Sequence, residues 1–299
     1  MASYPPVAPE NGAKFTSILR KSSYPFIKNA RHQGHRILIT GGARGIGKAI
    51  ALSFARAGAK AIAVADITES FDELTSKLTA AAKENGYPAP QVVLIHLDVT
   101  DEDSVQKCAE TIKSQLEGKL DILINNAGYM TAAFPVPESD TATWWRTFEV
   151  NLKGVYLMSK HFIPLLLSTP DGSKTIVSIS SVAAHAFRLC ASAYGTSKLA
   201  ALRLTEFLMT ETGDKGLLAY CVHPGAILTQ LAREAMPPET FPILDDDISL
   251  ASDTIGWLTS ERREWLAGRY ISCTWDMREL LERRSEIEEG DKLKVRLIV

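Results

Sequence analysis

Short apolar runs alternate along this chain with longer segments in which apolar residues recur at helical spacing. Each run is nearly continuous in aliphatic residues, a pattern typical of strands buried on both faces of a sheet. The regular strand–helix alternation predicts one α/β domain with a doubly wound, seven-stranded parallel sheet flanked by helices. The predicted strands are 36–40, 61–65, 91–97, 120–124, 175–180, 217–222 and 268–274.

The segments between the runs predict helices at 48–57, 68–85, 101–115, 141–167, 248–259 and 278–288, and another that extends past Lys198. Asn151 and Gly154 are poor helix formers inside 141–167, which indicates a local bulge or a tight contact; a plain surface asparagine is the alternative. Segment 231–247 is irregular, and either a substrate lid or a simple connector fits it. Residues 292–299 show strand-like alternation.

The chain divides by pattern into three parts. Residues 1–34 form an N-terminal leader with four prolines and several basic residues. They predict a mobile tail or an arm over the domain, and fit a transit peptide less well. Residues 35–275 form the α/β domain, and residues 276–299 form a charged C-terminal extension.

Composition excludes several classes of function. The 299 residues are 45% hydrophobic and 23% charged, with a net charge of −2, so no basic footprint for nucleic acid is present. The four cysteines and six histidines show no ligand spacing, which predicts no metal site and no disulfide framework. No signal peptide or membrane span is recognisable. We therefore expect a cytoplasmic protein that does not act at a membrane.

Ser181, Tyr194 and Lys198 are the strongest candidates for chemistry. Tyr194 and Lys198 lie one helical turn apart on one face, and Ser181 follows a predicted strand. A free phenol titrates near ~10. A neighbouring ammonium favours the phenolate, so we expect the pKa of Tyr194 to fall toward that of a general acid/base. The Tyr–Lys pair taken alone also fits an ordinary amphipathic helix.

A glycine-rich loop between the first strand and helix offers a place for a hydride-carrying dinucleotide. Strand, glycine turn and helix N-terminus form the context that a pyrophosphate needs. The candidate contacts in this loop are Gly41, Arg44, Gly45, Ile46 and Gly47. Asp66, after the second strand, predicts NAD because its carboxylate suits ribose hydroxyls and repels a 2′-phosphate. Arg44 favours NADP, and we give Asp66 the greater weight.

Other strand ends carry residues suited to the same cofactor. Asp98 and Val99 follow the third strand, where an adenine would lie. Small and polar residues follow the fourth strand, and a Pro-Gly turn that can shape a wall beside a flat ring follows the sixth. These candidates are Asn126, Ala127, Gly128, Pro224, Gly225, Ile227 and Thr229.

Taken together and in order, these motifs resemble those of the short-chain dehydrogenase/reductase family over 36–273. Thr40-Gly41-x-x-x-Gly45-x-Gly47 resembles its cofactor loop, and Asn151, Ser181, Tyr194 and Lys198 resemble its catalytic tetrad. The resemblance implies a Rossmann fold and a homodimer or homotetramer. The chain departs from the family in its long leader, in Ser272–Met277, which lacks the usual Asp-Gly-Gly, and in its tail, which resembles a fungal-type branch. These departures put the common tetramer in doubt.

The resemblance implies an NAD(P)-dependent oxidoreductase that interconverts a secondary alcohol and a ketone. Tyr194 would move the proton, Lys198 would lower its pKa and bind the nicotinamide ribose, and Asn151 would hold a water. A bulky apolar small molecule is the expected substrate, with wall candidates Tyr129, Met130, His185, Phe187, Ala226, Met236 and Phe241. For His185, a plain polar residue at the rim is the alternative, and we give it the greater weight. The alternatives are a non-redox isomerase or lyase of the same family, and a cofactor-binding sensor.

Overall fold

The computed structural model describes residues 12–68 and 70–297. Its centre is one seven-stranded parallel sheet in the order β3-β2-β1-β4-β5-β6-β7, which confirms the predicted doubly wound fold. The strands are β1 (Arg36–Thr40), β2 (Ala61–Asp66), β3 (Gln91–His96), β4 (Ile122–Asn125), β5 (Thr175–Ile179), β6 (Leu218–His223) and β7 (Tyr270–Ser272). The strand order reverses between β1 and β4, and in such sheets a crevice opens at that switch point.

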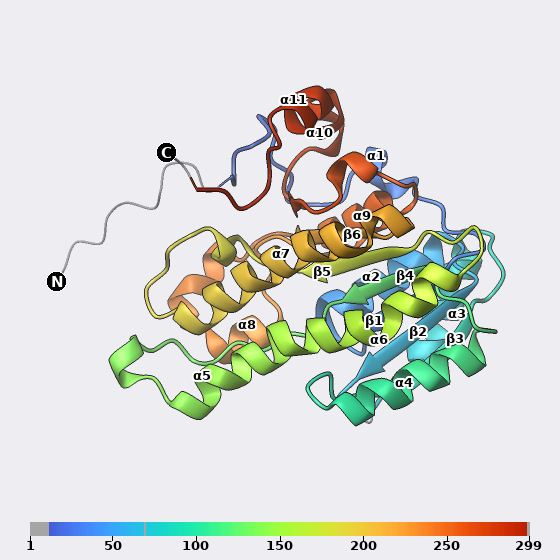
Figure 1. Ribbon diagram of the computed structural model, residues 1–299, viewed down its shortest axis with the longest axis horizontal. Helices are drawn as coiled ribbons and strands as arrows, with labels where there is room; N and C mark the ends of the chain where they lie inside the picture. Colours follow the sequence, from blue (N-terminus) through green and yellow to red (C-terminus); the bar gives the residue numbers. More distant parts are fainter. Residues whose placement is uncertain (1–11, 69, 298–299) are drawn as a thin grey trace.

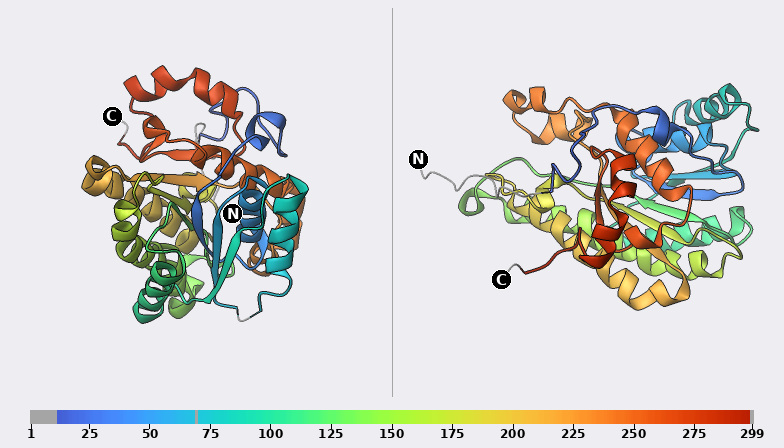
Figure 2. Two further views of the ribbon diagram at one scale, coloured as in Figure 1. Left: turned by 90° about the vertical axis from the view of Figure 1, so that its right-hand side faces the viewer. Right: turned by 90° about the horizontal axis from the view of Figure 1, so that it is seen from above.

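Helices cover both faces of the sheet, as Figures 1 and 2 show. On one face lie α2 (Gly45–Arg56), α3 (Leu74–Glu84) and α9 (Ile248–Thr259); on the other lie α4 (Glu102–Gln115), α6 (Gly154–Ser168) and α7 (Ser192–Thr212). Ile37 and Ile39 pack into the first layer, and Leu38 packs into the second. Because both faces are buried, the strands appear in the sequence as unbroken apolar runs.

The predicted bulge around Asn151 is confirmed. The long helix divides into α5 (Thr141–Phe148), a π-helical turn at Glu149–Lys153, and α6. Gly154 passes so close to the segment after β3 that an added Cβ would lie 2.8 Å from the Val99 side chain. The turn thus places Asn151 in the interior rather than on the surface.

Three sequence predictions near the C-terminus are corrected. Segment 231–247 is not irregular throughout: it contains most of α8 (Gln230–Ala235), which the Thr229 side chain caps, and a 3-10 helix at Pro238–Ile243. The predicted helix 278–288 divides into α10 (Met277–Glu282) and α11 (Arg284–Glu289), because Arg283 leaves helical geometry.

The predicted strand at 292–299 is wrong for residues 292–297, which form no strand; residues 298 and 299 lie outside the described chain. The Leu293 carbonyl does accept a bond from the Tyr270 amide at 2.8 Å. The charged side chains of Lys294 and Arg296 pair with Asp291, which folds the segment back instead of extending it. Helix α3 also begins later than predicted, at Leu74, and α2 begins earlier, at Gly45.

The described part of the leader, residues 12–34, lies as an arm that contacts the segment after β7, then α9, and reaches the turn between α2 and β2. Figure 1 shows α1 of this arm near α9. Leu19 forms a β-bridge with Trp275, and the short helix α1 (Pro25–Lys28) buries Ile27 completely. Residues 1–11 lie outside the described part. The proposed limits of the three sequence regions remain predictions. In the part of the chain that the structure describes, no helix combines the length and apolar character needed to cross a bilayer.

Candidate active site

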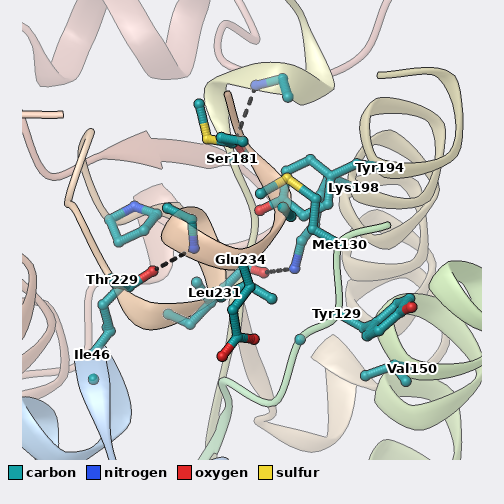
Figure 3. Close-up of a pocket in the computed structure, with 18 of the residues that line it drawn as sticks. Ile46, Tyr129, Met130, Val150, Ser181, Tyr194, Lys198, Thr229, Leu231 and Glu234 are labelled. Atoms are coloured by element: carbon teal, nitrogen blue, oxygen red, sulfur yellow. Dashed lines mark hydrogen bonds between the residues drawn. The ribbon is translucent and has the colours of Figure 1, made fainter. Parts of the chain in front are cut away.

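A cavity of about 870 Å³ opens at the carboxyl edge of the sheet, beyond the ends of the paired strands β1 and β4, where the strand order reverses. Of the predicted site residues, all but Gly47 and Asn151 line it. The lining residues from the prediction are Gly41, Arg44, Gly45, Ile46, Asp66, Asp98, Val99, Asn126, Ala127, Gly128, Ser181, Tyr194, Lys198, Pro224, Gly225, Ile227 and Thr229. Figure 3 shows Ser181, Tyr194 and Lys198 together, with Ile46 and Thr229 across from them. The fold therefore gathers motifs that are far apart in sequence.

The glycine loop leaves the first turn of α2 open toward the cavity. Arg44 is the N-cap residue of α2, but its side chain does not cap the helix. Gly45 has φ +54° and no atom within 4 Å of the position a Cβ would take. Unsatisfied N–H groups at a helix N-terminus form a site for anions such as phosphate. Gly47 serves the loop differently: a Cβ there would lie 2.3 Å from the Gly41 carbonyl oxygen.

Two carboxylates lie at this edge of the sheet: Asp66 is the last residue of β2, and Asp98 lies just beyond β3. Asp66 is 7% exposed, and its two oxygens accept the Ala43 amide at 3.0 Å and the Thr68 amide at 3.2 Å. Burial opposes the ionisation of Asp98, but bonds from Thr100 and the nearby Arg146 outweigh it, and the pKa of Asp98 lies below its ordinary value. Both carboxylates therefore face the cavity in fixed positions.

The Arg44 side chain binds the segment after β6. Its guanidinium donates to the Gln230 side-chain oxygen at 2.8 Å and so joins the glycine loop to α8. The cation that favours NADP in the sequence argument is thus engaged with α8. The Asp66 carboxylate, by contrast, is held against the loop itself.

Thr40, which the sequence analysis names only as part of the glycine-loop motif, supports the site. Its hydroxyl oxygen accepts the amides of Asn126 at 3.1 Å and Ala127 at 3.0 Å. The Asn126 side chain in turn donates to the carbonyls of Thr40 and Gly41. The ends of β1 and β4 are thereby locked together beneath the cavity. In the sequence, its position as a polar residue at the end of an apolar predicted strand could have identified Thr40.

Tyr194 and Lys198 lie on one face of α7, and Ser181 follows β5, as predicted. Lys198 is 4% exposed, and its ammonium donates to the Ile179 carbonyl at 2.8 Å. The ammonium nitrogen lies 5.6 Å from the centre of the Tyr194 ring. Ser181 caps the short turn at Val182–Ala184 by accepting the Ala183 amide at 3.1 Å. The three polar heads converge on one wall of the cavity.

The expected lowering of the Tyr194 pKa is contradicted. Burial raises the pKa of Tyr194, and an interaction with the Ser181 side chain opposes this only in part. Burial also lowers the pKa of Lys198 to about 8. The Lys198 ammonium, which was expected to favour the phenolate, donates to a backbone carbonyl. The phenol of Tyr194 is consequently protonated at neutral pH.

Asn151 is buried behind the cavity, and its side chain is fully engaged. It accepts the Tyr129 amide at 2.9 Å, donates to the Tyr129 carbonyl at 2.9 Å and donates to Ser197 at 3.1 Å. The side chain of Asn151 is thus occupied by protein partners, and that Asn151 holds a water, through its amide or its backbone, stays a prediction. The side chain ties the loop after β4 to α7 next to Lys198. Ser197 was not among the candidates from the sequence, and its position next to Lys198 is the one feature there that could have pointed to it.

The remaining wall comes from the end of β6, the segment after it and the loop after β4. His223, also missed, accepts the Val182 amide on Nδ1 at 3.2 Å, which fixes the backbone next to Ser181. Burial lowers the pKa of His223 to about 4, so the ring is neutral at pH 7. The wall candidates Tyr129, Met130, Ala226 and Met236 line the cavity.

Three other wall candidates do not line the cavity. His185 packs edge-on against Tyr270, with ring centres 4.5 Å apart. Phe187 is 86% exposed, and Phe241 packs under Arg233. Apolar residues that the sequence analysis did not name, among them Leu189, Leu231 and Leu244, line the cavity.

Comparison with known proteins decides the family. The family profile described as short chain dehydrogenase matches residues 35–240. The chain belongs to the short chain dehydrogenase family. The short chain dehydrogenase mpl6 of Monascus purpureus is 45% identical over 293 residues, which cover 97% of this chain and 99% of that protein. The short chain dehydrogenase andI of Emericella variicolor is 40% identical over 285 residues, 95% of this chain and 97% of that protein. These relatives place this short chain dehydrogenase in a fungal-type branch.

Solved structures share the fold. A 7α-hydroxysteroid dehydrogenase, solved with NADH and 7-oxo glycochenodeoxycholic acid, has a TM-score of 0.70 and 27% identity, covering 84% of this chain and 97% of that chain. Carveol dehydrogenase from Mycobacterium avium, solved with NAD, has a TM-score of 0.70 and 23% identity; the match covers 81% of this chain and 97% of that chain. Membership of this family makes the protein a nicotinamide-dependent oxidoreductase that acts on CH–OH groups.

Proposed function

We propose that this short chain dehydrogenase interconverts a secondary alcohol and a ketone with NAD(H), with Tyr194 as the proton-transferring group. The observation that carries the proposal is the convergence of Ser181, Tyr194 and Lys198 on a cavity that also contains an open helix N-terminus and a fixed carboxylate. Each of these features has a separate use in hydride transfer to a carbonyl.

The residues present fit a nicotinamide dinucleotide. The uncapped start of α2 and the space beside Gly45 suit its pyrophosphate. Asp66 would accept the ribose hydroxyls of the adenosine half, and its charge disfavours a 2′-phosphate. When bound, the reduced cofactor supplies the hydride. NADP stays the second choice, because Arg44 would have to leave Gln230 to reach a phosphate.

Protonated Tyr194 suits ketone reduction. Ser181 would hold the carbonyl oxygen by a hydrogen bond, and Tyr194 would donate its phenolic proton to that oxygen as hydride reaches the carbon. Lys198 would stabilise the phenolate that remains, because an ammonium nearby favours the charged form. Asn151 supports this by holding Ser197, the residue before Lys198. In oxidation the same groups work in reverse and require the phenolate.

The substrate end of the cavity is mostly apolar. Met130, Leu189, Met236 and Leu244 line it, which suits a bulky hydrophobic ketone or alcohol. The fungal origin of the similar short chain dehydrogenases supports a substrate from secondary metabolism. We further propose a cytoplasmic homo-oligomer, a dimer or a tetramer, that acts on small molecules.

An activity screen tests the proposal. Bulky cyclic ketones and secondary alcohols are incubated with NAD(H) and, separately, NADP(H), and the absorbance of the reduced nicotinamide is followed. We expect turnover with NAD(H) to exceed turnover with NADP(H). Tight binding of the cofactor without any absorbance change across broad panels would contradict the redox assignment and favour a non-redox enzyme or a binding protein.

The rate of ketone reduction is expected to fall as the pH rises through about 8, the pKa to which burial lowers Lys198. The ammonium exists below its pKa, so the decline occurs on the alkaline side, by about tenfold per unit once one proton is lost. A pH profile of kcat/KM measures this. Lys198→Arg, which stays charged, should be slower but show no decline near pH 8. A wild-type profile that is flat to pH 10 would contradict the assignment.

A further inference from the structure

One wall of the cavity is held by a carboxylate that the mechanism does not use. Asp246 accepts the Ala226 amide at 2.6 Å, and its own amide donates to the Ala226 carbonyl at 3.0 Å. Gly225, which has φ +106°, lies so close that a Cβ there would be 2.9 Å from the Asp246 carboxylate. The neighbouring residues Ile227 and Asp245 form a β-bridge. Asp246 thus closes the base of residues 224–247, which we call the pocket cover.

The pocket cover is in turn held by the N-terminal arm. The Lys21 carbonyl accepts the Asp247 amide at 2.7 Å, and the Lys21 ammonium pairs with Asp245. Asp247 also caps α9, by accepting the Ser249 amide at 2.8 Å. The arm therefore binds the two residues that flank Asp246.

The other side of the arm is anchored to the C-terminal region. Arg20 donates its amide to the Thr274 carbonyl at 2.7 Å and pairs with Asp276 at 2.6 Å, a carboxylate that is 5% exposed. The carboxylate of Glu279 accepts the amides of Ser17 and Ile18. A buried carboxylate that loses its partner is costly, so these contacts fix the arm firmly beside the cover.

We propose that the N-terminal arm is a functional part of the active site: it holds the turn at 245–247, and Asp246 in that turn positions the Gly225–Ala226 wall against the cofactor. This rests on the proposed function, because it assumes that a nicotinamide cofactor binds in the cavity. When the Gly225–Ala226 wall is mobile, it spends a smaller fraction of the time in the conformation that binds the cofactor. The apparent Kd of the cofactor equals the intrinsic Kd divided by that fraction, so the apparent Kd rises. Saturating ligand restores the wall, so binding constants change more than kcat.

Asp246→Ala tests the inner link, with Asp246→Asn as the conservative variant and Glu239→Ala as an exposed acid of the same cover. Hydrogen exchange followed by mass spectrometry measures the cover, and titration measures the Kd for NADH. For Asp246→Ala we expect exchange in peptides spanning 224–230 to rise about tenfold and Kd to rise about tenfold, with kcat changed less than threefold. The asparagine oxygen still accepts the Ala226 amide, so Asp246→Asn should show a much smaller effect, and Glu239→Ala none.

Arg20→Ala tests the arm, with the exposed neighbour Ser22→Ala as control. We expect faster exchange in the arm and in the cover, with β6 unchanged, and the same rise in Kd without a matching fall in kcat. Faster exchange in the arm with an unchanged cover would overturn the proposal, as would an unchanged 224–230 region in Asp246→Ala. If Asp246→Ala fails to fold, Asp246→Asn and Arg20→Ala decide by the same criteria. If the wild-type protein bound no nicotinamide dinucleotide, the proposed function would be refuted. Hydrogen exchange in Arg20→Ala would still show whether the arm holds the pocket cover.

Discussion

Replacing Tyr194 by phenylalanine is expected to reduce turnover by about 10²–10⁴-fold, the usual contribution of a positioned general acid or base. The variant removes the phenolic oxygen and keeps the ring, so the shape of the cavity wall and the contacts of Lys198 should persist. Steady-state kinetics with a substrate from the activity screen gives kcat. Fluorescence titration with NADH gives a Kd that we expect to change less than threefold.

Tyr156→Phe is the matched control for this prediction. Tyr156 is a half-exposed tyrosine on α6 that does not line the cavity, so removing its hydroxyl should leave both constants unchanged. If Tyr194→Phe retained nearly the wild-type rate, another group would have to supply the proton. The roles of Ser181 and Lys198 would then lose their basis as well.

Asp66→Ala is expected to move cofactor preference from NAD toward NADP. The carboxylate is nearly buried and lies against the glycine loop, so its charge acts on a 2′-phosphate with little screening by water. We expect kcat/KM with NAD to fall at least tenfold and kcat/KM with NADP to rise. Paired kinetics with the two cofactors measure the ratio of the two constants.

Two further variants separate charge from structure in this prediction. Asp66→Asn keeps an acceptor for the Ala43 amide and removes the charge, so it isolates the electrostatic part of the preference. Asp72→Ala removes an exposed carboxylate nearby and should leave the ratio unchanged. An NAD/NADP ratio that is unaltered in Asp66→Ala would refute the role given to this carboxylate.

The fold and most of the site were predictable from the sequence for a physical reason. Strands buried on both faces appear as unbroken apolar runs, and parallel topology brings their carboxyl ends to one edge. Residues as distant as Gly41, Ser181 and Gly225 therefore had to meet at one edge once the strands were recognised. Asn151 stood out because asparagine and glycine are unusual within a helix.

The errors arose where long-range contacts determine the outcome. Burial raises the pKa of Tyr194, and the Lys198 ammonium that was expected to lower it donates to the carbonyl of Ile179, in another element. The side chain of Asn151 is occupied by Tyr129 and Ser197, which spacing does not reveal. The contact between the arm and the turn at Asp246 joins segments more than 200 residues apart, and local sequence contains no trace of it.

Transfer of deuterium tests the central claim most directly. A bulky ketone from the activity screen is incubated with NADH that carries deuterium on the transferable side of its nicotinamide, and the product is analysed by mass spectrometry. Hydride transfer over Ser181, Tyr194 and Lys198 predicts an alcohol with one deuterium on the carbinol carbon. Conversion of the ketone to a product without deuterium, or without oxidation of the cofactor, would contradict it.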